Sequence, residues 1–243
     1  MKIALIGYGK MGRAIEALGI KQGNSFPVII DEHNSDHLKT GNLDGIDVAI
    51  EFSTPEAAPD NIRKCITMGL PVVTGTTGWN HLMPEAEAYC REKNGTLFHA
   101  SNFSIGVNIL FALNRTLARI MSQFPEYAVS MSEVHHILKK DAPSGTAITL
   151  AEQIIEANNQ ISSWLLKGSG DLKKTATGQL PIEAIREGEV KGQHTIRYES
   201  EMDSIILSHD AKTRDAFAVG ALLAAGFIKD KKGVYGMQDL LKL

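Results

Sequence analysis

Residues 2–12 have the sequence KIALIGYGKMG, and this stretch decides the fold. Residues 2–6 are mostly apolar and predict a short buried strand, and three glycines follow at Gly7, Gly9 and Gly12. Apolar side chains then recur at helical spacing over residues 11–22, and a second strand is predicted at residues 28–30. Strand, helix and strand in this order form a βαβ unit, which is the building block of a parallel sheet.

The three glycines predict a dinucleotide site because each has a separate physical role. The first permits a tight turn, the second lets a pyrophosphate approach the backbone, and the third lets the helix pack closely on the strand. The free N–H groups of the helix N-terminus then face the phosphates, with Lys10 and Met11 as further contacts. Asp31 ends the second strand, where an acid can accept hydrogen bonds from an adenosine ribose. A glycine-rich turn without a ligand is the alternative, and this surrounding pattern argues against it.

Further strands are predicted at residues 48–52, 72–74 and 96–99, with helices at residues 55–68 and 83–93 between them. This alternation predicts an α/β fold with a doubly wound parallel sheet of the Rossmann type. In such sheets the ligand lies beyond the carboxyl ends of the strands. The candidate cofactor contacts at these ends are Ser53, Gly75, Thr76, Thr77, Ala100, Ser101, Asn102 and Phe103.

The pattern changes after about residue 104. Helices are predicted at residues 107–124 and 146–157 and strands at 127–134, 182–186, 193–200 and 202–209, with a loop rich in Gly, Lys and Thr at 168–178. Successive strands without helices predict a second, α+β domain with a mixed or antiparallel sheet. An apolar helix at residues 217–228 then returns to the first domain. We therefore expect a dinucleotide-binding domain of residues 1–104 and 214–243, and a substrate-binding and oligomerisation domain of residues 105–213.

Residues 132–147 have the sequence SEVHHILKKDAPSGTA. This segment holds two histidines, two lysines, two acids and three hydroxyl residues, which are groups that transfer protons or bind anions. If the strand continues through His136, alternation puts Glu133 and His135 on one face and His136 on the other. A helix that begins near residues 143–146 offers free N–H groups to a carboxylate. The segment therefore indicates an anion site beside a proton donor. The alternative is that the two histidines are structural, Lys139 and Lys140 are a solvated charge pair, and residues 141–146 are only a helix cap.

This segment resembles the signature E-x-H-H-x-x-K-x-D-x-P-S-G-T-A of the dihydrodipicolinate reductase family. The likeness extends to GYGKMG at residues 7–12, GTTG at 75–78, ASNFSIGVN at 100–108 and SHDAKTR at 208–214, and it is weakest over residues 155–181. The resemblance implies the NAD(P)H-dependent reduction of a small cyclic dicarboxylate, 4-hydroxy-tetrahydrodipicolinate, in lysine and diaminopimelate biosynthesis.

The resemblance also implies roles for single residues. It makes His135 the proton donor and Lys139 its cationic partner. The glycine motif, Asp31 and the segments at residues 75–77 and 100–103 become nucleotide contacts. The residues that it implies for binding the substrate carboxylates are His136, Ser144, Gly145 and Thr146.

The sequence departs from the family pattern on the cofactor side. Members that favour NADPH often carry an arginine just after the ribose-binding acid, whereas Glu32 and His33 follow Asp31 here, and Thr54 stands where a second arginine is sometimes found. An acid beside another acid repels a 2′-phosphate. We therefore expect NADH to be used alone or together with NADPH, although Lys10 can still reach a phosphate.

Composition narrows the remaining possibilities. A formal net charge of -3 over 243 residues and a pI of about 6.2 provide no basic field for nucleic acid. The two cysteines, Cys65 and Cys90, have no zinc spacing, so we expect free thiols, no metal and a cytoplasmic location. No stretch is apolar enough to span a membrane.

Three functional alternatives follow from the sequence. Besides the resembled reductase, the chain fits another two-domain NAD(P)-dependent oxidoreductase, such as an amino-acid dehydrogenase, or a non-catalytic nucleotide-sensing regulator. The paired histidines followed by K-x-D-x-P-S-G-T favour the first. We also expect a homo-oligomer, a tetramer as the resemblance implies, because the late strands would otherwise leave an exposed edge or face.

Overall fold

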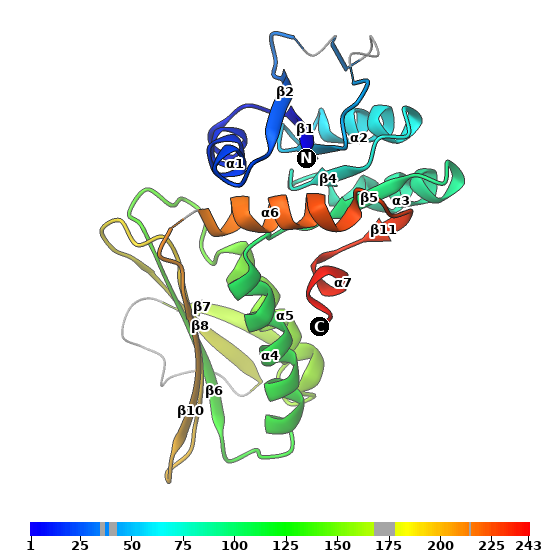
Figure 1. Cartoon of the computed structure of the whole chain (residues 1–243). Helices are drawn as coiled ribbons and strands as arrows, with labels where there is room; N and C mark the ends of the chain where they lie inside the picture. The colour runs from blue at the N-terminus through cyan, green and yellow to red at the C-terminus, as the bar shows by residue number, and fades with distance from the viewer. Residues whose placement is uncertain (35–36, 39–42, 168–177, 214) are drawn as a thin grey trace. The chain divides into compact units, whose positions relative to one another are not determined.

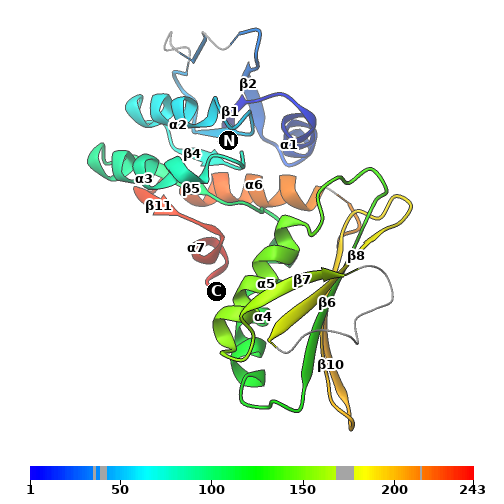
Figure 2. The ribbon, with the colours of Figure 1, turned by 180° about the vertical axis from the view of Figure 1, so that it is seen from behind.

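The computed structural model describes residues 1–34, 37–38, 43–167, 178–213 and 215–243. The chain forms two compact units, one of Met1–Ile105 with Asp215–Leu243 and the other of Gly106–Arg214 (Figures 1 and 2). Of the predicted loop at residues 168–178, all but Gly178 lies outside the described residues. No helix among the described residues combines the length and the apolar character that crossing a membrane requires.

The first unit is built on a six-stranded sheet in which every strand pair is parallel. The strand order is β11-β5-β4-β3-β1-β2. The bounds are β1 (Lys2–Ile6), β2 (Ser25–Ile30), β3 (Val48–Glu51), β4 (Val72–Thr74), β5 (Thr96–His99) and β11 (Gly233–Tyr235). This sheet confirms the predicted doubly wound α/β fold.

Helices cover both faces of this sheet (Figure 1). They are α1 (Lys10–Lys21), α2 (Ala58–Thr67), the 3-10 helix η2 (Asn80–Leu82), α3 (Met83–Glu92), α6 (Asp215–Ile228) and α7 (Met237–Leu241). Ile3 and Leu5 of β1 join one apolar core with α1 and α6, whereas Ala4 and Ile6 join another with α2 and α3. Burial on both faces explains why the strands are continuous apolar runs.

The second unit holds a mixed five-stranded sheet in the order β10-β9-β6-β8-β7. Its elements are α4 (Ile105–Met121), β6 (Ala128–His135), α5 (Gly145–Ala157), β7 (Ser163–Lys167), β8 (Gln179–Arg186), β9 (Gln193–Glu199) and β10 (Ser204–Asp210). The central strand β6 is parallel to β8 and antiparallel to β9. Both helices contribute to a single apolar core with the sheet. The expected α+β class with a mixed sheet is therefore confirmed.

Candidate active site

Strand β6 carries the two residues at the centre of the site in the second unit. Glu133 and His135 alternate with outward-facing neighbours and are 0% and 8% exposed. The strand ends at His135, and His136 lies half-buried in the turn that follows, where its carbonyl accepts from the Lys139 N–H at 3.1 Å. The structure thus places Glu133 and His135 on one face, as alternation predicts.

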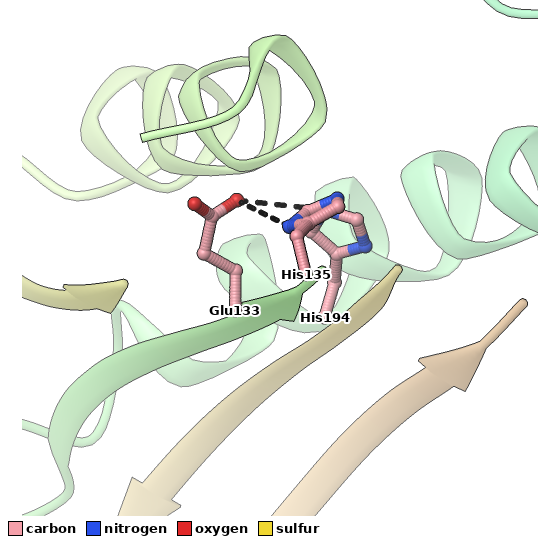
Figure 3. Close-up of side chains that lie close together, drawn as sticks. All are labelled: Glu133, His135 and His194. Carbon is pink, nitrogen blue, oxygen red and sulfur yellow. Dashed lines mark ion pairs between the residues drawn. The ribbon is translucent and has the colours of Figure 1, made fainter. Parts of the chain in front are cut away.

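Glu133 is a buried carboxylate with donors at both oxygens. Its Oε2 accepts from the Ser144 backbone N–H at 3.0 Å, and its Oε1 accepts from Arg186 Nη2 at 3.0 Å. Oε2 also lies 3.5 Å from His135 Nδ1 and 3.8 Å from His194 Nε2 (Figure 3). Burial alone would raise the pKa of Glu133, but the Ser144 and Arg186 hydrogen bonds outweigh it and the pKa lies below the usual value. Glu133 is therefore ionised at neutral pH.

The two imidazoles beside Glu133 meet edge to face, with ring centroids 5.2 Å apart. Burial lowers the pKa of His135, and the charge of Glu133 only partly opposes this. Burial and then the neighbouring His135 lower the pKa of His194 to about 4. His194 is therefore neutral at pH 7.

Arg186 ties the loop after β6 to this buried acid. Besides Glu133, its Nη2 donates to the Asp141 carbonyl at 2.6 Å, and its Nε donates to the Lys139 carbonyl at 3.3 Å. Within the loop, Lys139 Nζ donates to both Asp141 carboxylate oxygens at 2.8 and 2.7 Å. The Lys139 side chain is thereby held near the site, 20% exposed and already paired with an acid.

The N-terminus of α5 lies next to the histidines. Ser144 is its N-cap, and its Oγ accepts from the Ala147 N–H at 3.2 Å and lies 3.1 Å from His194 Nε2. Gly145 is exposed with open space where a side chain would be, and Thr146 is half-buried. N–H groups at the start of a helix favour carboxylates. The helix-cap reading of Ser144 is correct, and it is compatible with an anion site.

The donor atoms of Glu133, His135 and His194 lie within 4.8 Å of one another, close enough to bind a metal ion. However, the carboxylate already accepts from Ser144 and from the Arg186 guanidinium, whose charge balances its own. A cation there would also meet Arg186. We therefore assign no metal to this cluster and interpret it as a hydrogen-bonded histidine–carboxylate group.

The first unit carries the candidate cofactor site at the turn from β1 to α1. Gly7 has a φ of +94°, and a Cβ there would lie 2.1 Å from the Phe52 carbonyl oxygen, so only glycine fits. A Cβ at Gly12 would lie 2.3 Å from the Gly7 oxygen. At Gly9, the residue before α1, nothing lies within 4 Å. The turn is therefore closed at two glycines and open at the middle one, as a bound pyrophosphate requires.

Asp31 lies directly after β2 and shapes its own turn. Its Oδ1 accepts from the His33 N–H at 2.9 Å, and its N–H donates to Asn34 Oδ1 at 2.7 Å. Lys10 is exposed and Met11 half-buried at the start of α1, and Glu32 is 86% exposed. The end of β2 therefore carries a half-buried acid, Asp31, next to an exposed one, Glu32.

The ends of β4 and β5, together with η2 and the start of α3, form a pocket of about 230 Å³ lined by Thr74, Thr76, Thr77, Asn80, Met83, His99, Ala100 and Ser101. Beneath it lies Glu51, which is fully buried and accepts from the Ser53 N–H at 3.0 Å, Thr74 Oγ1 at 2.6 Å and Thr76 Oγ1 at 3.0 Å. Glu51 therefore joins two of the loops that the sequence proposes as cofactor contacts.

Two other candidates occupy less accessible positions. Phe103 is only 2% exposed and packs on Phe52 and Phe98, so a cofactor contact there falls to its backbone. Gly75 has Phe52 ring atoms 2.2 Å from where its Cβ would be, which makes it a packing glycine. Asn102 Oδ1 accepts from the Ser104 N–H at 2.8 Å and orders the turn before α4.

Sequence reasoning missed Glu51, Arg186 and His194. Strand pairing places His194 opposite Glu133 and Arg186 opposite His135. Neither histidine nor arginine lies in a recognisable motif, and the register that brings them to β6 is not visible in the sequence. Glu51 lies inside the strand predicted at residues 48–52, and an acid within an otherwise apolar run just before Ser53 and Thr54 was the signal that could have identified it.

Comparison with known proteins agrees with this geometry. The family described as dihydrodipicolinate reductase matches in both of its parts, the N-terminus over residues 1–103 and the C-terminus over residues 106–241. The chain belongs to the dihydrodipicolinate reductase family. This confirms the resemblance found in the sequence and disfavours the amino-acid dehydrogenase and regulator alternatives.

Similar reductase-family proteins cover nearly the whole chain. The 4-hydroxy-tetrahydrodipicolinate reductase of Christiangramia forsetii is 43% identical over 99% of this chain and 98% of its own. That of Methanocaldococcus jannaschii is 38% identical over 81% of this chain and 72% of its own. Among solved structures, the dipicolinate-bound dihydrodipicolinate reductase of Paenisporosarcina sp. TG-14 has a TM-score of 0.72 at 21% identity, covering 98% of this chain and 99% of that chain. At this identity the structure shows the shared fold alone.

Proposed function

We propose that this chain catalyses the NAD(P)H-dependent reduction of 4-hydroxy-tetrahydrodipicolinate to tetrahydrodipicolinate in lysine and diaminopimelate biosynthesis. The observation that carries the proposal is the 43% identity over 99% of the chain to a protein with that activity in its name. The reaction consumes the substrate, the reduced dinucleotide and one proton, and it yields tetrahydrodipicolinate, the oxidised dinucleotide and water.

The first unit fits the cofactor because its glycine turn is open only where a pyrophosphate would lie. The N-terminus of α1 would bind the phosphates, Asp31 the adenosine ribose, and the loops that Glu51 joins the nicotinamide end. When bound, the reduced nicotinamide supplies a hydride. The half-buried Asp31 and the exposed Glu32 would repel a 2′-phosphate at the ribose, which favours use of NADH beside or above NADPH.

The second unit supplies substrate binding and the proton. One carboxylate of the substrate would accept from the N–H groups at the start of α5 and from the Thr146 hydroxyl, with His136 as a further contact. His135 would donate the proton, since imidazolium is the side-chain acid that most readily gives up a proton near neutral pH. Lys139 would offset the negative charge that develops on the ring.

Binding of a dianionic substrate also resolves an apparent conflict. The lowered pKa of His135 leaves it largely neutral in the free protein, yet a proton donor must be charged. Two carboxylates placed nearby favour the imidazolium and raise the pKa again. We therefore propose that His135 takes up its proton as the substrate binds.

We further propose a cytoplasmic homotetramer that assembles through the sheet of the second unit. No described helix covers the face of that sheet opposite α4 and α5 (Figure 2). That face bears small and apolar residues, including Ser132, Leu165 and Ile206, and the edge strand β10 is mostly exposed. An uncovered face and a free edge are the surfaces through which sheets associate.

The test is a turnover assay with freshly generated 4-hydroxy-tetrahydrodipicolinate, followed by the loss of reduced-nicotinamide absorbance with each cofactor. We expect substrate-dependent oxidation of NADH, and inhibition by dipicolinate that is competitive with the substrate. Absence of turnover with both cofactors would refute the proposal. Turnover with NADPH alone would leave the activity standing and refute the cofactor preference.

A further inference from the structure

We infer that Glu133 and His194 are positioning residues for this reaction: Glu133 holds His135 with its proton-transfer atom at Nε2, and His194 holds the α5 cap. The inference rests on the proposed function, but one of its tests does not need the substrate. It concerns a buried network that spans four elements, β6, β8, β9 and the start of α5.

Glu133 determines which ring nitrogen of His135 carries the proton. Glu133 Oε2 lies 3.5 Å from His135 Nδ1, which is buried and has no hydrogen-bond partner within normal distance. A carboxylate favours an N–H at the ring nitrogen that it faces, and such contacts often shorten only when substrate binds. The proton at Nδ1 then leaves Nε2 as the atom that exchanges a proton with the substrate. Gly192 leaves room beside Nε2, since a Cβ there would lie 3.1 Å away.

Hydrogen bonds hold the Glu133 carboxylate in this orientation. Its carboxylate is 0% exposed and is held by the Ser144 N–H on one oxygen and by Arg186 on the other. Arg186 also holds the loop that carries Lys139, so one guanidinium sets both the acid and the loop. An ionised carboxylate in this position stabilises an imidazolium at His135.

His194 acts as a neutral side chain. Its Nε2 lies 3.1 Å from Ser144 Oγ, and its ring packs edge to face on His135. A neutral imidazole fills this space and holds the cap without repelling a protonated His135. His194 therefore positions the α5 N-terminus, where the substrate carboxylate would bind.

The titratable and charged groups around His135 come from every neighbouring element. Glu133 lies on its own strand, Lys139 and Asp141 on the following loop, Arg186 on β8 and His194 on β9, with His209 of β10 paired opposite His194. Among these, Glu133 raises the pKa of His135, as Asp141 also does, and Lys139 and Arg186 lower it. Removing the charge of Glu133 must therefore move the titration of His135 to lower pH.

Substitutions of Glu133 and of His194 should have different kinetic effects. This difference distinguishes a positioning role from a general loss of stability. If protonated His135 is the donor, kcat/KM falls as pH rises through its pKa. Glu133→Gln should shift this alkaline limb down by about one pH unit or more, the usual size for an opposite charge at this distance. His194→Gln should leave the limb in place and raise KM several-fold, because the cap of α5 loosens. Glu199→Gln, on the exposed end of β9, is the matched control and should change neither quantity.

A second measurement stands on the free wild-type protein. ¹⁵N NMR of the histidine side chains should show neutral His135 with its proton at Nδ1. If Glu133→Gln is poorly folded, Glu133→Asp serves in its place because it keeps the charge. Its kcat/KM should fall over the same pH range as that of the wild type, while its kcat is lower. The inference would be overturned if kcat/KM of Glu133→Gln fell over the same pH range as that of the wild type. It would also be overturned if neutral His135 in the wild type carried its proton at Nε2. Failure of the wild type to turn over would instead refute the proposed function, and the NMR result would still test the geometry.

Discussion

His135 ends strand β6 with its imidazole almost fully buried beside an ionised carboxylate. Burial alone disfavours the charged form of a histidine, so a proton donor at this place depends on its neighbours. Glu133 and the arriving substrate carboxylates supply that support. Whether His135 can act as a proton donor thus depends on the charged groups in direct contact with it.

His135→Ala should lower kcat by about 10²-fold or more, the usual loss when a general acid is removed. The dissociation constant for NADH should hardly change, since the glycine turn lies in the first unit. Steady-state kinetics and fluorescence titration with NADH measure the two quantities. If His136→Ala abolished turnover and His135→Ala did not, the donor would have to be reassigned to His136.

Asp31→Asn should weaken NADH more than NADPH, because it replaces one of two acceptor oxygens for the ribose hydroxyls by an NH2 donor and removes a charge that repels a 2′-phosphate. We expect kcat/KM for NADH to fall and that for NADPH to fall less or to rise. Measuring both values in the wild type and the variant gives the ratio directly. An unchanged ratio would mean that Asp31 does not face the ribose.

The residues of the site differ in how visible they are in the sequence. His135, Lys139 and Ser144 lie in one segment of a dozen residues, so spacing and alternation suffice to bring them together. His194 and Arg186 reach Glu133 only through the pairing of β6 with β9 and β8. Strand order and register depend on long-range packing, which a single sequence does not display.

Individual elements follow the same logic. The predicted helices and strands of the parallel sheet occur within a few residues of their expected bounds, because buried strands and amphipathic helices have strong periodic patterns. Among the described residues, four short elements were not predicted: β7, η2, β11 and α7. η2 and β11 have three residues each and α7 has five, too few for a period to show, and β7 has exposed leucines in mid-strand.

Helix α6 shows how closely an element can be fitted to its sheet. It packs on β3, β4 and β5, and a Cβ at Gly220 would lie 1.8 Å from the Phe103 carbonyl oxygen. Gly220→Ala should therefore reduce the free energy of unfolding by about 1–3 kcal/mol or more, because the backbone must move apart. Gly226→Ala, in the same helix with only one atom near, is the control and should be neutral or stabilising by up to about 1 kcal/mol. Urea unfolding of both variants tests this, and equal stabilities would contradict it.

At the scale of the whole molecule, the proposed tetramer accounts for apolar side chains on the open sheet of the second unit. Sedimentation should give a tetramer at micromolar concentration. Ile206→Lys places a charge on β10, where Ile206 is 49% exposed, and should dissociate it. Met202→Lys, at an 83% exposed position outside the strands, should not. A stable wild-type monomer would refute the assembly.

The central claim is that this chain transfers hydride to a cyclic dicarboxylate. Its most direct test uses NADH carrying two deuterium atoms at C4 of the nicotinamide, with freshly generated 4-hydroxy-tetrahydrodipicolinate and analysis of the product by mass spectrometry. We expect tetrahydrodipicolinate that is heavier by about one mass unit than the product made with ordinary NADH, as hydride transfer from the cofactor requires. Unlabelled product, or no product while the wild-type protein binds NADH, would contradict it.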